Sequence, residues 1–188
     1  MREPLVPTHR PSPLGFTIIE LMVTLSIVAI LVGLAAPSLR DTIMNIRITG
    51  QTNDLMSDLA LARSEAAKRN VPVVVCTSSN GTTCSATAWN LGWLVYPDLD
   101  VSGTQQVATE KALKTRATLE GQNSLALTCA PTTNSITYRP TGTSGSPSAI
   151  FTLCDTRTTV NAGRTIAINS TGRALAARVT CPITPACP

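Results

Sequence analysis

The chain has 188 residues and a formal net charge of +4, with 43% hydrophobic but only 3% aromatic residues. Valine, isoleucine, leucine and alanine must therefore fill most of its core. The charge is mild and alone does not indicate a nucleic-acid-binding protein. The one histidine, His9, lies near the N-terminus, and the rest shows no paired carboxylates at a recognisable catalytic spacing. These features argue against an enzyme, and no cofactor is predicted.

Residues 1–15 are polar and rich in proline, and they carry an excess of positive charge. This excess predicts that the N-terminus stays in the cytoplasm. A signal-peptidase cut after the small residues that precede Pro37 is disfavoured, because proline would follow the cut. The alternative cut, between Gly15 and Phe16, would remove the leader and leave the following apolar segment attached.

Residues 16–36, FTIIELMVTLSIVAILVGLAA, are apolar except for a few small polar residues and one carboxylate, Glu20. About 20 apolar residues at about 1.5 Å rise each can cross the hydrocarbon core of a bilayer. The segment therefore predicts a membrane-spanning helix. An ionised group inside it needs a partner, so Glu20 indicates a function.

Residues 13–21, PLGFTIIEL, resemble the class III signal of type IV pilins and type II secretion pseudopilins. The resemblance implies that prepilin peptidase cuts after Gly15 and that Phe16 becomes the N-methylated first residue. It implies that Glu20 is the acidic fifth residue of the mature chain. Pro37 matches the proline that kinks or loosens the helix in this family.

Glu20 has a predicted role in assembly. Its carboxylate can pair with the ammonium of Phe16, either in its own chain or in a neighbouring subunit. Pairing between subunits would lower the cost of burying both charges and would fix their axial register, as a buried polar group does in a coiled coil.

Residues 37–70 predict an amphipathic helix that ends before Val71-Pro72. Gly50 interrupts the pattern and predicts a bend. The apolar residues expected on one buried face are Leu39, Ile43, Ile46, Leu55, Leu59, Ala62 and Ala66. The charged residues expected mostly on the opposite face are Arg40, Asp41, Arg47, Asp54, Asp58, Arg63, Glu65 and Lys68.

Residues 71–188 predict a β-rich head, because short β-branched runs alternate with loops of Gly, Ser, Thr and Pro. The expected strands are 71–77, 88–96, 125–129, 135–139, 149–154, 164–169 and 173–180, with Gly92 as a β-bulge in the second. Trp89 and Trp93 would then share a face of that strand and pack in the core or on the sheet surface. The fold class is α+β, a long N-terminal helix packed on an antiparallel sheet.

All six cysteines follow the membrane segment, which favours disulfides in an oxidising compartment. Zinc is the competing interpretation, but the chain has no C-x₂-C pair and its only histidine lies in the leader. Cys76 and Cys84 are expected to pair across a short hairpin loop. The pairing of Cys129, Cys154, Cys181 and Cys187 stays open, with three possible connectivities.

Motifs in the head resemble the GspH/FimT family of minor pilins and pseudopilins. They are ARSEA (62–66), VVVC (73–76), WNLGWLV (89–95) and NSTGR (169–173). The resemblance implies a non-enzymatic filament subunit that helps to initiate assembly at the tip. Its partners would be other pilins or pseudopilins, prepilin peptidase and the inner-membrane assembly platform. The head would lie in the periplasm of a single-pass inner-membrane protein, and then in a pilus or pseudopilus.

An alternative is a DNA-binding minor pilin for natural transformation. Some members of this family bind DNA through a Gly-Arg-x-Arg motif, and Gly172-Arg173 matches its first half, although Leu175 replaces the second arginine. Arg173 and Arg178 are an odd number of residues apart and would face opposite sides of a strand. The candidate DNA contacts are Arg173, Arg178 and Arg164, with Arg139 and Arg157 as further members of a basic patch.

Asp98, Asp100, Ser102 and Gly103 alternate as in a calcium-binding loop. The remaining EF-hand ligands, including a late glutamate, do not follow at the required spacing. A plain turn is the favoured interpretation, and no metal site is predicted.

Overall fold

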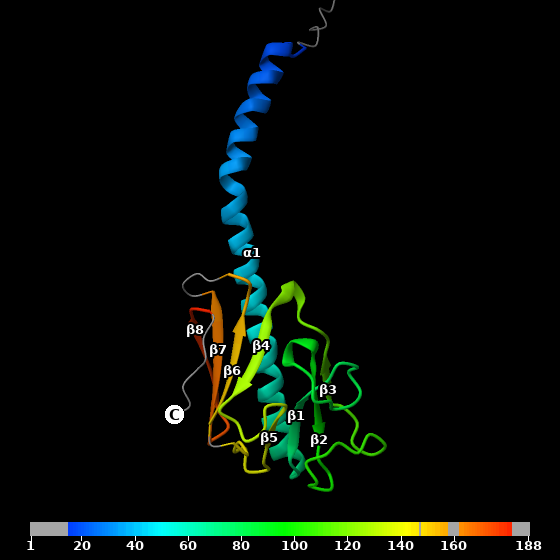
Figure 1. The fold of residues 1–188 in the computed structure, drawn as a ribbon. Coiled ribbons are helices and arrows are strands. Elements are labelled where there is room, and N and C mark those ends of the chain that lie inside the picture. Colours follow the sequence, from blue (N-terminus) through cyan, green and yellow to red (C-terminus); the bar gives the residue numbers. More distant parts are fainter. Residues whose placement is uncertain (1–14, 147, 158–161, 182–188) are drawn as a thin grey trace, which may run out of the picture. The chain divides into compact units, whose positions relative to one another are not determined.

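The computed structural model describes residues 15–146, 148–157 and 162–181. Contacts divide the chain into two compact units, one up to Asp41 and one from Thr42 onward. Both units contain part of helix α1 (Ile18–Arg69), which is 52 residues long (Figure 1).

Helix α1 is one long helix, as predicted, and contains most of the two predicted segments, 16–36 and 37–70. It also continues through Gly50. A single glycine costs only about 1 kcal/mol relative to alanine in a helix, so good helix formers on both sides carry the helix through it. The helix ends at Arg69, in agreement with the prediction, and Asn70 takes a φ of 55° that turns the chain toward Pro72.

The head contains two four-stranded antiparallel sheets (Figure 1). The first has the order β3 (Lys114–Arg116), β2 (Trp93–Pro97), β1 (Val73–Thr77) and β5 (Ser135–Tyr138). The second has the order β4 (Ser124–Thr128), β6 (Ser148–Cys154), β7 (Gly163–Asn169) and β8 (Ala174–Val179). Two 3₁₀ turns, η1 (Trp89–Leu91) and η2 (Glu120–Gln122), lie in the connections. The α+β class predicted from the sequence is confirmed.

The predicted strand at 88–96 is wrong in its first half. Trp89 lies in η1, and the strand begins at Trp93, so the two tryptophans do not share a strand face. Between them Gly92 has a φ of +124°, and a Cβ there would lie 2.9 Å from the carbonyl oxygen of Ser78. Only glycine fits this close approach, which separates the turn from the strand. Strand β3 was not predicted, because its three residues, KTR, show no buried alternation.

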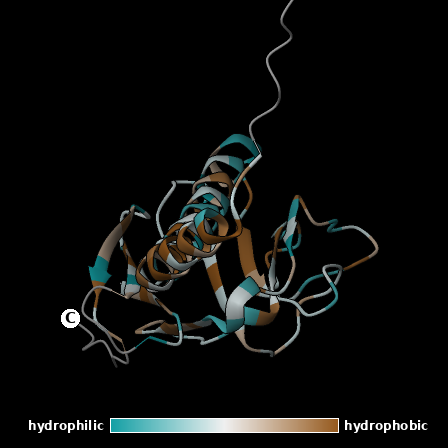
Figure 2. Ribbon diagram, turned by 90° about the horizontal axis from the view of Figure 1, so that it is seen from above, coloured by the Kyte–Doolittle hydropathy of each residue, from teal (hydrophilic) through white to brown (hydrophobic). Residues whose placement is uncertain are grey.

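One hydrophobic core joins the second half of helix α1 to the inner faces of both sheets (Figure 2). Trp89 joins η1 to the second sheet, since its ring meets that of Phe151 in β6 edge-on at 4.8 Å. The buried apolar residues of the helix are Ile48, Leu55, Leu59, Ala62 and Ala66. The prediction for Leu39, Ile43 and Ile46 is wrong, because they are 61%, 49% and 69% exposed. The buried stripe begins only at Ile48, and helical periodicity alone does not show how far along a helix its packing partners reach.

Strands β1 and β2 are buried on both faces. Their outer face carries Val74, Cys76, Leu94 and Tyr96, against which Cys84 and Ala112 from the adjoining loops pack. Because these loop residues bury the outer face of β1, the strand has no solvent-exposed side. A strand buried on both sides needs no polar alternation, which explains the unbroken β-branched run of β1.

Candidate functional site

The first turn of helix α1 is capped by Thr17. The backbone N–H of Glu20 donates to Thr17 Oγ1 at 3.3 Å, and the N–H of Leu21 donates to the Thr17 carbonyl at 3.2 Å. Thr17 and Glu20 thus stand at the spacing of a capping box, and the carboxylate of Glu20 lies in the first turn, where the helix dipole favours negative charge. Gly15, Phe16 and Thr17 precede the helix.

Every side chain from Gly15 to Ala36 is exposed, including the aromatic ring of Phe16 at 84%. By length and composition this part of the helix can cross a membrane. The hydroxyls of Thr24 and Ser26 donate to the carbonyls of Leu21 and Met22, at 3.0 and 2.8 Å. These polar groups are therefore satisfied inside the helix, and Glu20 is the one ionisable side chain that an apolar environment would have to accommodate.

A buried ionic network fixes the second half of the helix to the first sheet. Asp58, only 2% exposed, accepts hydrogen bonds from Trp93 Nε1 at 3.0 Å and from Arg116 Nε at 2.8 Å. Arg116 also pairs with the half-exposed Asp54 at 3.0 Å. The hydrogen bond that Arg116 donates to Asp58 raises the pKa of Arg116, and burial opposes this effect.

This network was missed in the sequence, where Asp58 was grouped with the charged face. The position of Asp58 in the sequence indicated its burial, because it stands three residues after Leu55 and four before Ala62, on the buried stripe of the helix. A carboxylate at a core position of a helix needs a partner, and the tryptophan and arginine of the sheet provide it.

The structure joins Cys76 to Cys84, the pairing expected from the hairpin loop, and Cys154 to Cys181. The second disulfide ties the end of β6 to the residues after β8. Cys129 is also disulfide-bonded, whereas Cys187 lies outside the described residues. Because Cys181 is bonded to Cys154, this bond selects one of the three connectivities left open by the sequence.

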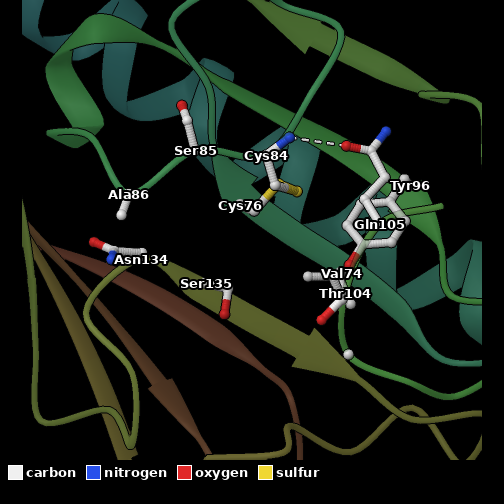
Figure 3. A pocket seen from close by; sticks show the side chains of 11 residues that line it. Val74, Cys76, Cys84, Ser85, Ala86, Tyr96, Thr104, Gln105, Asn134 and Ser135 are labelled. Atoms are coloured by element: carbon white, nitrogen blue, oxygen red, sulfur yellow. Dashed lines mark hydrogen bonds between the residues drawn. A yellow bond between two sulfur atoms is a disulfide. The ribbon is translucent and has the colours of Figure 1, made fainter. Parts of the chain in front are cut away.

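A pocket of about 440 Å³ lies on the outer face of β1, β2 and β5, beside the Cys76–Cys84 disulfide (Figure 3). Gln105 closes one side, where its Oε1 accepts the backbone N–H of Cys84 at 2.8 Å. The described lining residues include no carboxylate or cationic side chain. Burial, with Asp98 and Glu110 nearby, raises the pKa of Tyr96 and keeps its phenol neutral. The pocket can offer hydrogen bonds but no acid–base pair.

The acidic loop after β2 is held by its own backbone. Asp98, 2% exposed, accepts the N–H groups of Ser102 and Gly103 at 3.0 and 2.9 Å, and Asp100 accepts the N–H of Ser102 at 3.1 Å. Glu110, fully buried, accepts the N–H groups of Leu99 and Gln106, each at 2.6 Å. The three carboxylates lie within 4.8 Å of one another. Their hydrogen bonds give them a structural role in ordering the loop.

The candidate DNA-contact arginines fall in two places. Arg164 and Arg178 are directly opposite each other on β7 and β8. Arg173 lies apart from them in the turn before β8, where its N–H donates to Asn169 Oδ1 at 2.9 Å. The turn explains Gly172, which has a φ of +76° and whose Cβ would meet the carbonyl of Gly142. Arg139 follows β5 and bonds through its backbone to Thr143.

Family models match two parts of the chain. The model described as type II transport protein GspH matches residues 51–172, which is more than half of the sequence. The model described as the prokaryotic N-terminal methylation motif matches residues 12–36, the segment that contains Gly15, Phe16 and Glu20.

Among solved structures, the chain is similar to the type IV minor pilin FimU of Pseudomonas aeruginosa PAO1 in two crystal forms. In the first, the TM-score is 0.55 at 18% identity, over 70% of this chain and 88% of FimU. In the second, the TM-score is 0.53 at 18% identity, over 69% of this chain and 91% of FimU. No curated protein matches the sequence. The likeness shows a shared fold, a long N-terminal helix with antiparallel sheets packed on it.

Proposed function

The chain belongs to the family of type II transport protein GspH, and on this premise we propose that it is a non-enzymatic minor subunit of a type IV pilus or type II secretion filament. The observation that carries the proposal is the exposed apolar half of helix α1, with its single carboxylate at Glu20. A surface of this kind needs lipid before assembly and the helices of other subunits after it.

In this proposal prepilin peptidase cuts after Gly15, and Phe16 becomes the N-methylated first residue. The new ammonium and the Glu20 carboxylate of a neighbouring subunit then form a pair in the apolar interior of the filament. Because an unpaired charge there is costly, this pair selects one axial register between subunits. Pro37 would loosen the helix where it leaves the apolar layer.

Two features support an orientation with the N-terminus in the cytoplasm and the head in the periplasm. The leader carries an excess of arginine, which favours the cytoplasmic side. The head carries disulfides, which persist in an oxidising compartment. The proposed partners are other pilins or pseudopilins and the inner-membrane assembly platform, which would extract the helix during assembly. The proposed role is to help to initiate the filament at its tip.

The test is deletion of the gene, followed by two measurements in one strain. The first is the number of surface pili with their twitching motility, and the second is export of type II secretion substrates. Lost pili with normal export would identify a type IV minor pilin, and lost export with normal pili would identify a secretion pseudopilin. Normal pili with normal export would contradict the proposal.

The alternative is a DNA-binding minor pilin for natural transformation. The proximity of Arg164 and Arg178 favours it, whereas the separate position of Arg173 weakens it. Binding of the detergent-solubilised full-length chain to duplex DNA, measured at several salt concentrations, tests it. Phosphate recognition predicts a steep loss of affinity as salt rises, together with loss of DNA uptake in the deletion strain.

A further inference from the structure

The two described sheets end in four outer strands, and the structure protects three of them. Strand β3 is only three residues long and carries Lys114 and Arg116, and both its length and its charge discourage pairing. The edge of β5 is covered, because Thr137 accepts the N–H of Gly145 at 2.7 Å. Strand β4 packs beside η1. Strand β8, the outermost strand of the second sheet in Figure 1, is paired in the described part of the chain with β7 alone.

Strand β8 is regular and exposed. Its six residues, ALAARV, stand in unbroken register with β7, and its four central side chains are exposed, Leu175 by 54%. The strand has no proline, no bulge in this register and one charged side chain, Arg178. A flat and mostly apolar edge of this kind is a ready template for pairing with another strand.

The ladder with β7 determines which backbone groups of β8 point outward. At the turn between the strands, the N–H of Asn169 donates to the carbonyl of Arg173 at 3.2 Å. Main-chain pairing in an antiparallel ladder recurs at every second residue, so the odd-numbered residues of β8 bond to β7. The even-numbered residues direct their N–H and C=O groups away from the sheet. They are Ala174, Ala176 and Arg178.

The chain's own C-terminal sequence does not suit this edge. Cys181, two residues after β8, is bonded to Cys154 at the end of β6, with 5.9 Å between the Cα atoms. Its sulfur lies against Gly163 of β7, so the chain turns inward across the sheet after β8. The sequence that follows, PITPACP, has a proline at three of its seven positions and lacks N–H groups that edge pairing requires. A strand from another molecule is therefore the matching occupant.

A second copy of the same edge fits poorly, because the second half of α1 packs on one face of the sheet. If two β8 strands pair antiparallel, a half-turn about the sheet normal relates the two molecules, and their helices run in opposite directions. If they pair parallel, the helices lie on opposite faces of the joined sheet. Subunits whose apolar helices start in one membrane and gather in one filament need helices that run in the same direction on the same side.

We propose that the outer edge of β8 is a docking site for an extended segment of a different filament subunit, which adds a fifth strand to the second sheet. The outward main-chain groups of Ala174, Ala176 and Arg178 supply the hydrogen bonds, and the added strand packs against the exposed Leu175. The small alanines leave room for the side chains of that strand. This inference rests on the proposed function as a filament subunit.

The experiment places the photo-crosslinking residue p-benzoylphenylalanine at position 175 of the full-length chain in its host. After irradiation, mass spectrometry identifies the cross-linked protein and peptide. We expect a different filament subunit. Ala176→Pro removes an outward N–H and puts its ring in the path of the added strand, so it should lower the cross-linked product about tenfold or more. Ala176→Ser, the matched control, keeps the N–H and should leave the product unchanged.

A stability measurement separates edge pairing from a structural role. Because the N–H of Ala176 points away from β7, the Tm of the detergent-solubilised Ala176→Pro chain should stay close to that of the wild type. Ala177→Pro removes an N–H that bonds to β7 and should lower the Tm. If Ala176→Pro does lower the Tm, Ala174→Pro makes the same test at the first residue of the strand, where proline is tolerated.

Four results would overturn the proposal. The cross-link could survive both outward-facing proline substitutions, or it could be lost only from variants whose Tm has fallen. It could join two copies of this chain, or DNA, instead of a different subunit. Finally, a strain that assembles filaments could yield no cross-linked protein at all.

These outcomes are distinguishable from failure of the proposed function. If deletion of the gene leaves pili and export intact, the proposed function fails first. If deletion abolishes either of them but the Ala176→Pro chain restores it fully, the edge pairing alone is wrong.

Discussion

The two halves of helix α1 have the same secondary structure but opposite surfaces. In the first half, Leu31 and Leu34 are 60% and 74% exposed, and the apolar residues surround the helix. In the second half, Leu55 and Leu59 are each 1% exposed, and they belong to a single stripe. A helix that is apolar on all sides needs an apolar environment on all sides, whereas a striped helix needs one packing partner.

Hydrophobicity and burial are separate properties of this chain. The most apolar part of the sequence contributes nothing to the core of the head. The core instead depends on a modest stripe of leucine, alanine and isoleucine, together with one carboxylate, Asp58. Substitutions in the two halves should therefore affect different measurements.

The largest expected effect is that of Glu20→Val. It should abolish incorporation into filaments, because the ammonium of a neighbouring Phe16 would lose its partner in an apolar environment. Membrane insertion, leader cleavage and the Tm of the head should not change. Immunoblots of sheared filaments and membrane fractions measure incorporation, insertion and cleavage, and thermal unfolding of the detergent-solubilised chain measures the Tm. Normal incorporation of the variant would contradict the role proposed for Glu20.

In the second half of the helix, Asp58→Ala should lower the free energy of unfolding by about 3–5 kcal/mol, because it removes the partner of both the buried Trp93 indole N–H and the part-buried Arg116 guanidinium. Urea unfolding of the detergent-solubilised chain measures the change. Asp54→Ala is the matched control. Asp54 pairs with the same arginine but is half exposed, so its removal should cost about 0–1 kcal/mol. Equal losses for the two variants would show that burial of Asp58 is unimportant.

The same leucine-to-alanine change should distinguish the two halves directly. Leu59→Ala should cost about 2–5 kcal/mol of head stability, because it leaves a cavity in the core. Leu31→Ala should leave the unfolding transition of the head unchanged, since its side chain is 60% exposed and does not belong to the core cluster of the described residues. If both variants shifted the midpoint alike, the two halves would form one cooperative unit.

A smaller effect is expected at the turn between β7 and β8. Gly172→Ala should destabilise the head by about 1–3 kcal/mol, because its φ of +76° and the nearby Gly142 carbonyl leave no room for a Cβ. Thermal unfolding measures the change. Gly103→Ala is the control, since its φ of +72° is similar but no atom lies within 4 Å of the added carbon. The difference between the two variants isolates the steric part of the cost.

Local signals predicted most of the elements. Val71-Pro72 marked the end of the helix, and β-branched runs between turn residues predicted β1 and β4 to β8 within about two residues. Lys114–Arg116 has no such pattern and becomes a strand only because β2 offers it a free edge. The arrangement as two sheets was equally invisible, because the periodicity of a strand does not reveal its neighbours.

Some candidate site residues were likewise evident from a local signal in the sequence, whereas others depend on how the strands pair. Glu20 was evident because a charge in an apolar run violates a local rule. The pairing of Arg164 with Arg178 was not, because it depends on the register of two strands. Ile43 and Ile46 fitted the helical period but lie before the start of the buried stripe. Sequence spacing thus predicts which residues share a face, whereas only the structure shows what that face contacts.

The Thr17 cap has a consequence for proteolysis. A peptidase binds its substrate as extended backbone, and the Gly15–Phe16 bond lies outside the hydrogen-bonded ladder of helix α1. Because the Thr17 hydroxyl and carbonyl accept the N–H groups of Glu20 and Leu21, the first turn is held from Thr17 onward without the residues that precede it. A cut after Gly15 would therefore remove the leader without unwinding any helix, and the new N-terminus would be only one residue from a turn that is already formed.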